Sequence, residues 1–224
     1  MNVKAIVIDM DGTITNFNLD YMAARRRALQ ELERLNLRTA EFNEQVNLYI
    51  ILNKLKTNLD PKAFTELKTT FYRYFEEMEA KAAQDVSLYP GAADTLRKLK
   101  SQSIKLGLVT NNGRAGTSAT LKRHHIEQLF DSVVTRDDCE EMKPDSAPIR
   151  KVLKELHVEA ADAILVGDGV MDILAAKATG LVSVAVTTGP FPSDRLLQAE
   201  PDYLLGSIND VLALLSQLKL ATHS

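Results

Sequence analysis

The segment AIVIDMDGT (residues 5–13) is the part of the chain that most strongly constrains the fold. Residues 5–8 are all apolar and mostly β-branched, with no polar alternation, and this pattern predicts a strand buried on both faces. Two aspartates and a glycine follow at once. In parallel α/β sheets ligands bind beyond the carboxyl ends of the strands, so Asp9 and Asp11 stand where a site is expected.

Similar apolar runs recur along the chain and alternate with segments of helical character. The further predicted strands are residues 106–109, 132–134, 163–166 and 182–186. The predicted helices between them are residues 92–101, 115–124, 146–156 and 171–179. Strands alternating with helices form right-handed βαβ units, so we predict an α/β fold with a doubly wound, Rossmann-like parallel sheet.

Residues 16–86 interrupt this alternation and predict an inserted helical domain. Apolar side chains recur there at helical spacing in two sets: Tyr21, Ala24, Ala28, Leu32 and Leu35, then Phe64, Leu67, Phe71, Tyr74 and Met78. Pro61 suits a first helical turn with Asp60 as its cap. We interpret the aromatic stripe as the core of a helical bundle. The predicted domains are thus residues 1–15 with 87–224, and residues 16–86.

Composition narrows the function classes. The 224 residues carry a net charge of -3, so no basic excess is available for nonspecific nucleic-acid binding. No apolar run approaches the ~20 residues needed to cross a bilayer, which predicts no membrane association. The single cysteine, Cys139, excludes an intrachain disulfide and fits a reducing compartment. We therefore expect a cytoplasmic protein.

Polar residues follow the other predicted strands as well. Thr110 and Asn111 follow the second strand, Lys143 comes after the third, and Asp168 and Asp172 follow the fourth. The carboxyl ends of parallel strands share one edge of the sheet, so these side chains should converge with Asp9 and Asp11. Each motif alone reads as a turn or a surface residue. Their succession after consecutive strands is what indicates a site.

Such a cluster predicts metal-assisted phosphoryl chemistry. Asp9, Asp11, Asp168 and Asp172 would repel one another unless a cation joined them, and Mg²⁺ prefers oxygen ligands and also binds phosphate. One of the two aspartates after the first strand could attack phosphorus while the other protonates the leaving oxygen. A calcium-binding EF-hand is not favoured, because a strand and not a helix precedes the acidic stretch.

Phosphate itself should be bound by groups of opposite polarity at the same edge. Lys143 would neutralise charge on the nucleophile and the phosphate. The Thr110 hydroxyl, with backbone N–H groups around Gly12 and Asn111, could bind the phosphoryl oxygens. These residues complete the predicted catalytic and phosphate-binding set.

The ordered motifs resemble the haloacid dehalogenase superfamily of phosphohydrolases, in the branch of phosphoglycolate phosphatase and β-phosphoglucomutase with a small helical cap. The resemblance runs from Val3 to about Tyr203 and includes the phrase YPGA at residues 89–92. Two departures are Ser146, where relatives usually have a second proline two residues after the first, and Gly169, where many have serine. Neither removes a functional group.

The resemblance implies specific roles. Asp9 would be the nucleophile and a metal ligand, and Asp11 the general acid/base with its backbone carbonyl on the metal. Thr110, with Asn111 beside it, would bind phosphate together with Lys143. Asp168 would bind the metal, with Asp172 a ligand or an outer-shell acid. An aspartate at position 11 favours phosphoryl transfer over dehalogenation, because an alkoxide leaving group needs a proton and a halide does not.

Several functions remain open at this point. The first is a Mg²⁺-dependent phosphatase acting on a small monoester such as phosphoglycolate or a sugar phosphate. A phosphomutase would need a second phosphate site, for which the cations of residues 25–56 are candidates, and inorganic pyrophosphate is another possible substrate. A non-catalytic phosphate-binding protein is the remaining alternative. The expected partner is a small phosphorylated metabolite, and the protein should be a monomer or homodimer.

Overall fold

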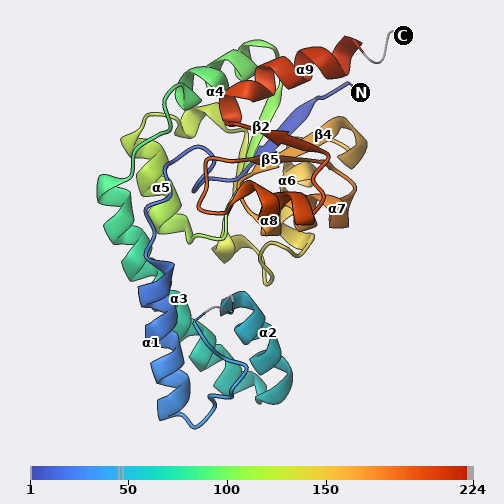
Figure 1. Cartoon of the computed structure of the whole chain (residues 1–224). Coiled ribbons are helices and arrows are strands. Elements are labelled where there is room, and N and C mark those ends of the chain that lie inside the picture. The colour runs from blue at the N-terminus through green and yellow to red at the C-terminus, as the bar shows by residue number, and fades with distance from the viewer. Residues whose placement is uncertain (1, 45, 47, 221–224) are drawn as a thin grey trace. The chain divides into compact units, whose positions relative to one another are not determined.

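The computed structural model describes residues 2–44, 46 and 48–220 and divides them into two compact units. One unit contains Met1–Asn18 and Asp85–Ser224, and the other contains Leu19–Gln84. Figure 1 shows the strands and most helices of the first unit and the helical composition of the second. In the described part of the chain, no helix combines the length and apolar character that a membrane crossing requires.

The first unit is built on a six-stranded sheet in the order β3-β2-β1-β4-β5-β6, with every neighbouring pair parallel. The strands are β1 Ala5–Ile8, β2 Lys105–Val109, β3 Ser132–Val134, β4 Ala163–Gly167, β5 Val182–Val186 and β6 Tyr203–Leu205. The predicted α/β class and parallel sheet are confirmed. The short strand β6 was not predicted.

Helices cover both faces of the sheet, as buried strands require. They are α4 Ala92–Ser101, α5 Arg114–Arg123, α6 Ala147–Leu156, α7 Val170–Thr179, α8 Ser193–Gln198 and α9 Val211–Leu220. Ile6 and Ile8 pack in a core with α4, α5 and α9, whereas Ala5 and Val7 pack with α6 and α7. Alternate residues of β1 therefore serve opposite layers, which explains why the whole strand is apolar.

The second unit has its own apolar core. Its helices are α1 Tyr21–Arg34, α2 Leu48–Asn58 and α3, which begins at Pro61 and ends at Asp85. Leu32, Ile51, Leu67 and Phe71 are buried together there, with Phe64 and Tyr74 packed against them. The aromatic stripe is thus bundle core, as interpreted from the sequence. Helix α2 was not predicted.

The predicted cap of α3 is present. The Asp60 carboxylate accepts hydrogen bonds from the backbone N–H groups of Lys62 (3.1 Å) and Ala63 (3.0 Å), while Pro61 occupies the first turn. Proline needs no partner for an N–H group at this position, and the aspartate satisfies two of the donors that a helix start leaves exposed.

Candidate active site

The carboxyl ends of the central strands bring the predicted residues to one edge of the sheet. Asp9 directly follows β1, and its N–H donates to the carbonyl of Val166 in β4 at 2.9 Å. Thr110 follows β2, with its N–H donating to the carbonyl of Val134 at 3.1 Å. Asp168 follows β4. Main-chain pairing thus fixes the start of each functional segment relative to its neighbour.

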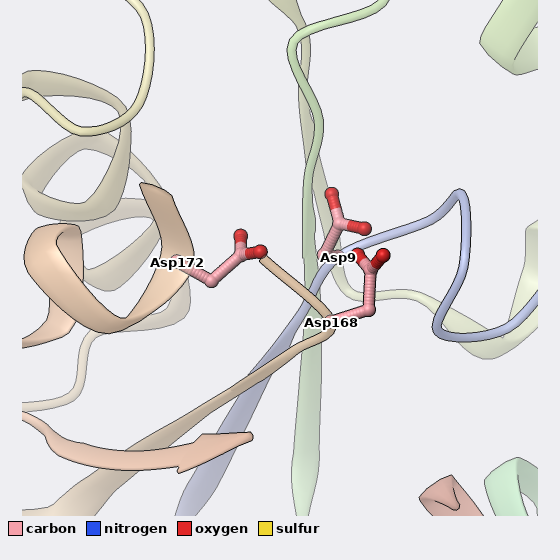
Figure 2. Close-up of side chains that lie close together, drawn as sticks. All are labelled: Asp9, Asp168 and Asp172. Carbon is pink, nitrogen blue, oxygen red and sulfur yellow. The ribbon is translucent and has the colours of Figure 1, made fainter. Parts of the chain in front are cut away.

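Three buried carboxylates form the centre of the site. Asp9, Asp168 and Asp172 each offer an oxygen within 4.8 Å of the others, and all three side chains are buried. Figure 2 shows Asp9 and Asp168 projecting from adjacent strand ends, with Asp172 pointing toward them from the first turn of α7. Asp172 Oδ2 accepts a hydrogen bond from the Gly169 N–H at 3.0 Å, so the start of α7 orients this carboxylate.

Lys143 provides the positive charge among these acids. Its ammonium nitrogen lies 2.6 Å from Asp9 Oδ1, 2.7 Å from Asp172 Oδ1 and 2.8 Å from the carbonyl oxygen of Val109. The side chain is only 3% exposed. An ammonium group has three protons, and these three acceptors account for all of them. Lys143 therefore joins the residues after β1, the end of β2 and the start of α7 through one buried charge.

Burial and mutual repulsion shift the ionisation of the cluster. Burial raises the pKa of Asp9 to about 6, against the opposing effect of Lys143. Burial, followed by the charges of Asp9 and Asp172, raises the pKa of Asp168 to about 9. Burial alone would lower the pKa of Lys143, but Asp172 and Asp9 raise it above its ordinary value. One lysine thus leaves the acids under-compensated, and a further cation would favour their charged forms.

Two residues that follow β2 make different contacts: Asn111 contacts the main chain of Lys143, and Thr110 contacts the main chain of Asn112. The Asn111 side-chain amide donates to the carbonyl of Lys143 and accepts the N–H of Lys143, both at 3.0 Å. The Thr110 hydroxyl accepts the Asn112 N–H at 3.2 Å. The side chain of Asn111, which was expected to lie beside the phosphate, therefore forms two hydrogen bonds with the main chain of Lys143.

Asp11 lies apart from the other three carboxylates. It is only partly buried, and its side chain accepts hydrogen bonds from the Thr15 hydroxyl at 3.1 Å and from the Asn112 amide at 2.5 Å. The expectation that four carboxylates crowd together is met by three in the described part of the chain. The reason is local: the turn after β1 directs Asp11 toward Thr15 and the loop after β2.

This constellation can be compared with known proteins. Residues 6–186 match the family model described as haloacid dehalogenase-like hydrolase. The chain belongs to this family. The resemblance inferred from the ordered motifs is thereby confirmed.

Individual proteins match this haloacid dehalogenase-like hydrolase over nearly its full length. The pyrophosphatase PpaX of Bacillus mycoides (strain KBAB4) is 28% identical over 221 residues, covering 97% of this chain and 99% of that protein. The structure of a predicted phosphoglycolate phosphatase of Haemophilus somnus 129PT matches with a TM-score of 0.63 and 23% identity, covering 95% of this chain and 97% of that chain. The structure of a Thermotoga maritima protein provisionally assigned as a β-phosphoglucomutase matches with a TM-score of 0.63 and 25% identity, covering 96% of this chain and 99% of that chain.

Two glycines make room for Asp168 in this haloacid dehalogenase-like site. A Cβ atom built on Gly12 would lie 2.2 Å from Asp168 Oδ2, and one built on Gly189 would lie 1.8 Å from the same oxygen. Gly12 also has a φ of +85°, which side chains rarely adopt. Its N–H donates to the carbonyl of Thr15 at 2.8 Å, so this group, predicted near the phosphate, already closes the turn.

The segment around Gly189 was not predicted to belong to the site. The Thr188 hydroxyl donates to the carbonyl of Gly12 and the Tyr89 hydroxyl donates to the carbonyl of Thr188, both at 2.5 Å. The loop after β5 is thereby tied to the loop after β1. The strand-end rule would have found it, since Thr187-Thr188-Gly189 follows the fifth predicted strand.

Proposed function

We propose that this haloacid dehalogenase-like hydrolase is a Mg²⁺-dependent phosphatase that hydrolyses a small phosphate monoester through an aspartyl-phosphate on Asp9. The observation that carries the proposal is the buried Asp9 carboxylate, held at 2.6 Å by Lys143 and gathered with Asp168 and Asp172 at the carboxyl edge of the sheet. The family is one of hydrolases, and the site supplies both a carboxylate nucleophile and a phosphate-compatible charge pattern.

The donor set fits a hard divalent ion. Asp9, Asp168 and Asp172 offer only oxygen ligands, and the raised pKa values of Asp9 and Asp168, caused first by burial, indicate carboxylates that a cation would stabilise in their charged form. Mg²⁺ prefers such ligands and keeps positions for water and phosphate oxygens. When bound, the ion would offset the negative charge shared by carboxylates and phosphate.

The chain's own residues then perform two displacements. In the first, an Asp9 oxygen forms a bond to phosphorus as the bond from phosphorus to the leaving oxygen breaks, and Asp11 gives that oxygen a proton. In the second, water attacks phosphorus while Asp11 removes a proton, which releases phosphate and regenerates the Asp9 carboxylate. Lys143 holds Asp9 in place and, with the Thr110 hydroxyl, would stabilise charge on the phosphoryl group.

The candidate cations of the helical unit bear on the phosphomutase alternative. A mutase must hold a second phosphate, but the candidate cations of residues 25–56 already have partners. Five of them pair with acids: Arg26 with Glu44, Arg27 with Glu77, Arg34 with Glu31, Arg38 with Glu33 and Lys54 with Glu41. Arg25 donates to the carbonyl oxygen of Glu44, and Lys56 also has a partner. A second phosphate would have to compete with these contacts.

Pyrophosphate is the second candidate substrate. The observation that favours it is the full-length similarity to the Bacillus protein named pyrophosphatase PpaX, whereas phosphoglycolate is suggested by the phosphoglycolate phosphatase resemblance. Both are small and carry two anionic groups, and the same Asp9 chemistry would serve either. We further propose that the protein's partner is this small metabolite.

A phosphate-release panel tests these proposals. Phosphoglycolate, several sugar phosphates and pyrophosphate are supplied with Mg²⁺ or with chelator to the wild type, to Asp9→Asn and to Asp94→Asn. Asp94 is an exposed acid on α4 that pairs with Arg97 at the surface, so its variant serves as the matched control. Release that requires Mg²⁺ and Asp9 but not Asp94 supports the proposal. Equal release by Asp9→Asn would refute it, and phosphate binding without release would favour a non-catalytic role.

A further inference from the structure

Asn112 contacts the side chain of Asp11 across a long separation in sequence. Its amide nitrogen donates to Asp11 Oδ2 at 2.5 Å, while the Thr15 hydroxyl donates to Asp11 Oδ1 at 3.1 Å. Asn112 is 3% exposed and Asp11 is partly buried, so the amide makes this contact from a buried position. Both oxygens of the Asp11 carboxylate are therefore oriented by neighbouring side chains.

The main chain of Asn112 is anchored on both sides of its side chain. Its N–H donates to the Thr110 hydroxyl at 3.2 Å, and its carbonyl accepts the N–H of Arg136 at 2.9 Å. The amide is thus built on a fixed support and does not depend on Asp11 for its placement. Groups that orient a reacting side chain are effective when their own positions are fixed in this way.

The chemistry of the amide determines which Asp11 oxygen can carry a proton. The amide NH₂ group only donates, so it favours an unprotonated Oδ2. The Thr15 hydroxyl also lies 3.1 Å from the carbonyl oxygen of Met10, so its single proton can go to an unprotonated Oδ1 or to that carbonyl while the hydroxyl oxygen accepts from a protonated Oδ1. With Asn112 in place, a proton on Asp11 belongs on Oδ1.

We propose that Asn112 is the positioning residue for Asp11 in the proton transfer to the leaving group. This inference rests on the proposed phosphatase function, with Asp11 as its general acid. In the first displacement the proton on Oδ1 passes to the leaving oxygen as its bond to phosphorus breaks and the Asp9 oxygen bonds to phosphorus. Asp11 is left as a carboxylate whose two oxygens accept from Asn112 and Thr15, which is the arrangement in the structure.

Leaving groups of different basicity separate this role from a merely structural one. Glycerol 2-phosphate releases an alkoxide that needs a proton, whereas 4-nitrophenyl phosphate releases a stable phenolate that needs little help. In a reaction through a covalent intermediate, kcat/KM reports only the steps up to release of the first product, so the second displacement does not affect it. The measured quantity is the ratio of kcat/KM for the two esters, and because both are hydrolysed by the same preparation, the ratio does not depend on the folded fraction.

The variants are Asn112→Leu, which keeps a similar shape but removes the donor without adding a charge, and Asn112→Ala. Thr117→Val is the matched control: Thr117 is equally buried on α5, and its hydroxyl donates to the carbonyl of Gly113, away from Asp11. We expect both Asn112 variants to lose ~10- to 100-fold in kcat/KM for glycerol 2-phosphate and less than about threefold for 4-nitrophenyl phosphate. The control should leave the ratio unchanged.

Two other results would overturn the inference. Equal losses on both esters would mean that Asn112 supports the site in general and not the acid, and no loss on glycerol 2-phosphate would mean that Asp11 needs no such support. If the wild type hydrolyses neither ester nor any member of the phosphate panel, the proposed function fails first and the inference fails with it. That result involves the wild type and is distinct from a changed ratio in a variant.

Discussion

Substitution of Gly189 by alanine should disable the acidic cluster while leaving the fold intact. The added Cβ would lie 1.8 Å from Asp168 Oδ2, 2.5 Å from Cγ and 2.6 Å from Cβ, whereas ordinary contacts begin at 3.4 Å. Three atoms of one carboxylate-bearing side chain are affected, so rotation of the carboxylate alone cannot relieve the overlap. Unless the loop after β5 retreats, Asp168 must move by about 1 Å, a displacement that can cost ~100-fold when it affects a reacting or ligating group.

The assay measures Mg²⁺ affinity by calorimetry, kcat/KM on the best phosphate ester, and the thermal unfolding midpoint. Gly189→Ala should lower Mg²⁺ affinity and kcat/KM by ~100-fold or more, with a small shift in the midpoint. Gly180→Ala is the matched control, because Gly180 has a φ of +75° but no atom within 4 Å of the added Cβ. That variant should lose ~1 kcal/mol of folding free energy from backbone strain and keep its activity.

The two variants thus separate site geometry from stability. If Gly189→Ala binds Mg²⁺ and turns over substrate like the wild type, the loop after β5 can retreat from Asp168, and its tie through Thr188 to Gly12 does not constrain the site. If Gly180→Ala loses activity as severely as Gly189→Ala, the loss follows stability and not the position of the carboxylate.

Three further predictions address charge, pH and the helical unit. Lys143→Met removes the ammonium group between Asp9 and Asp172. We expect kcat/KM to fall ~100-fold or more, and the free energy of unfolding, measured with a denaturant series, to fall by ~3–5 kcal/mol. An active variant as stable as the wild type would contradict this. In chelator, the pKa of Asp168 is about 9 in the folded state against 3.8 for the free residue. Between these two pH values the folded state holds a proton that the unfolded state has lost. The free energy of unfolding should therefore fall as pH rises from 6 to 9, by up to ~1.4 kcal/mol per pH unit. Thermal unfolding with and without Mg²⁺ checks this, and a chelator midpoint that rises with pH would contradict it. Phe71→Ala, at a fully buried position, should cost the helical unit ~3–5 kcal/mol and speed amide exchange in α1 and α3; equal acceleration throughout the sheet would count against the separate apolar core.

The fold class could be predicted from the sequence because each buried parallel strand is a short, continuous run of apolar residues. All five predicted strands are present within a residue or so of their expected ends. Strand β6 was missed because Tyr203–Leu205 is short and lies at the edge, where little apolar sequence is required. Helix α2 was missed because the apolar residues of Leu48–Asn58 include consecutive members, which blur the helical period.

The candidate site could be predicted as far as strand ends determine it. Asp9, Lys143, Asp168 and Asp172 come together because each follows a strand of one parallel sheet. The position of Asp11 could not be predicted, since it depends on side-chain contacts with Thr15 and with a loop distant in sequence. The roles of these residues, the cytoplasmic location and the oligomeric state stay predictions.

The Asn-Asn pair after β2 shows the limit of local sequence reading most clearly. In sequence, residues 110–113 look like an ordinary turn, because asparagine and glycine are common in turns. In the structure, Asn111 holds the main chain of Lys143 while Asn112 holds the side chain of Asp11. Adjacent, chemically identical side chains thus have different partners, and only their three-dimensional setting distinguishes them.

The central place of β1 has a consequence for how the protein is made. Strand β1 pairs with β2 from Lys105 and with β4 from Ala163, so its main chain finds neither partner until much of the chain has been synthesised. Contacts so distant in sequence form slowly because a long loop must close first. During that interval an apolar strand next to Asp9 is exposed, a state that favours aggregation or chaperone binding. Among the strands of the sheet, the one next to the residue proposed to receive phosphate thus waits longest between its own synthesis and that of its first partner.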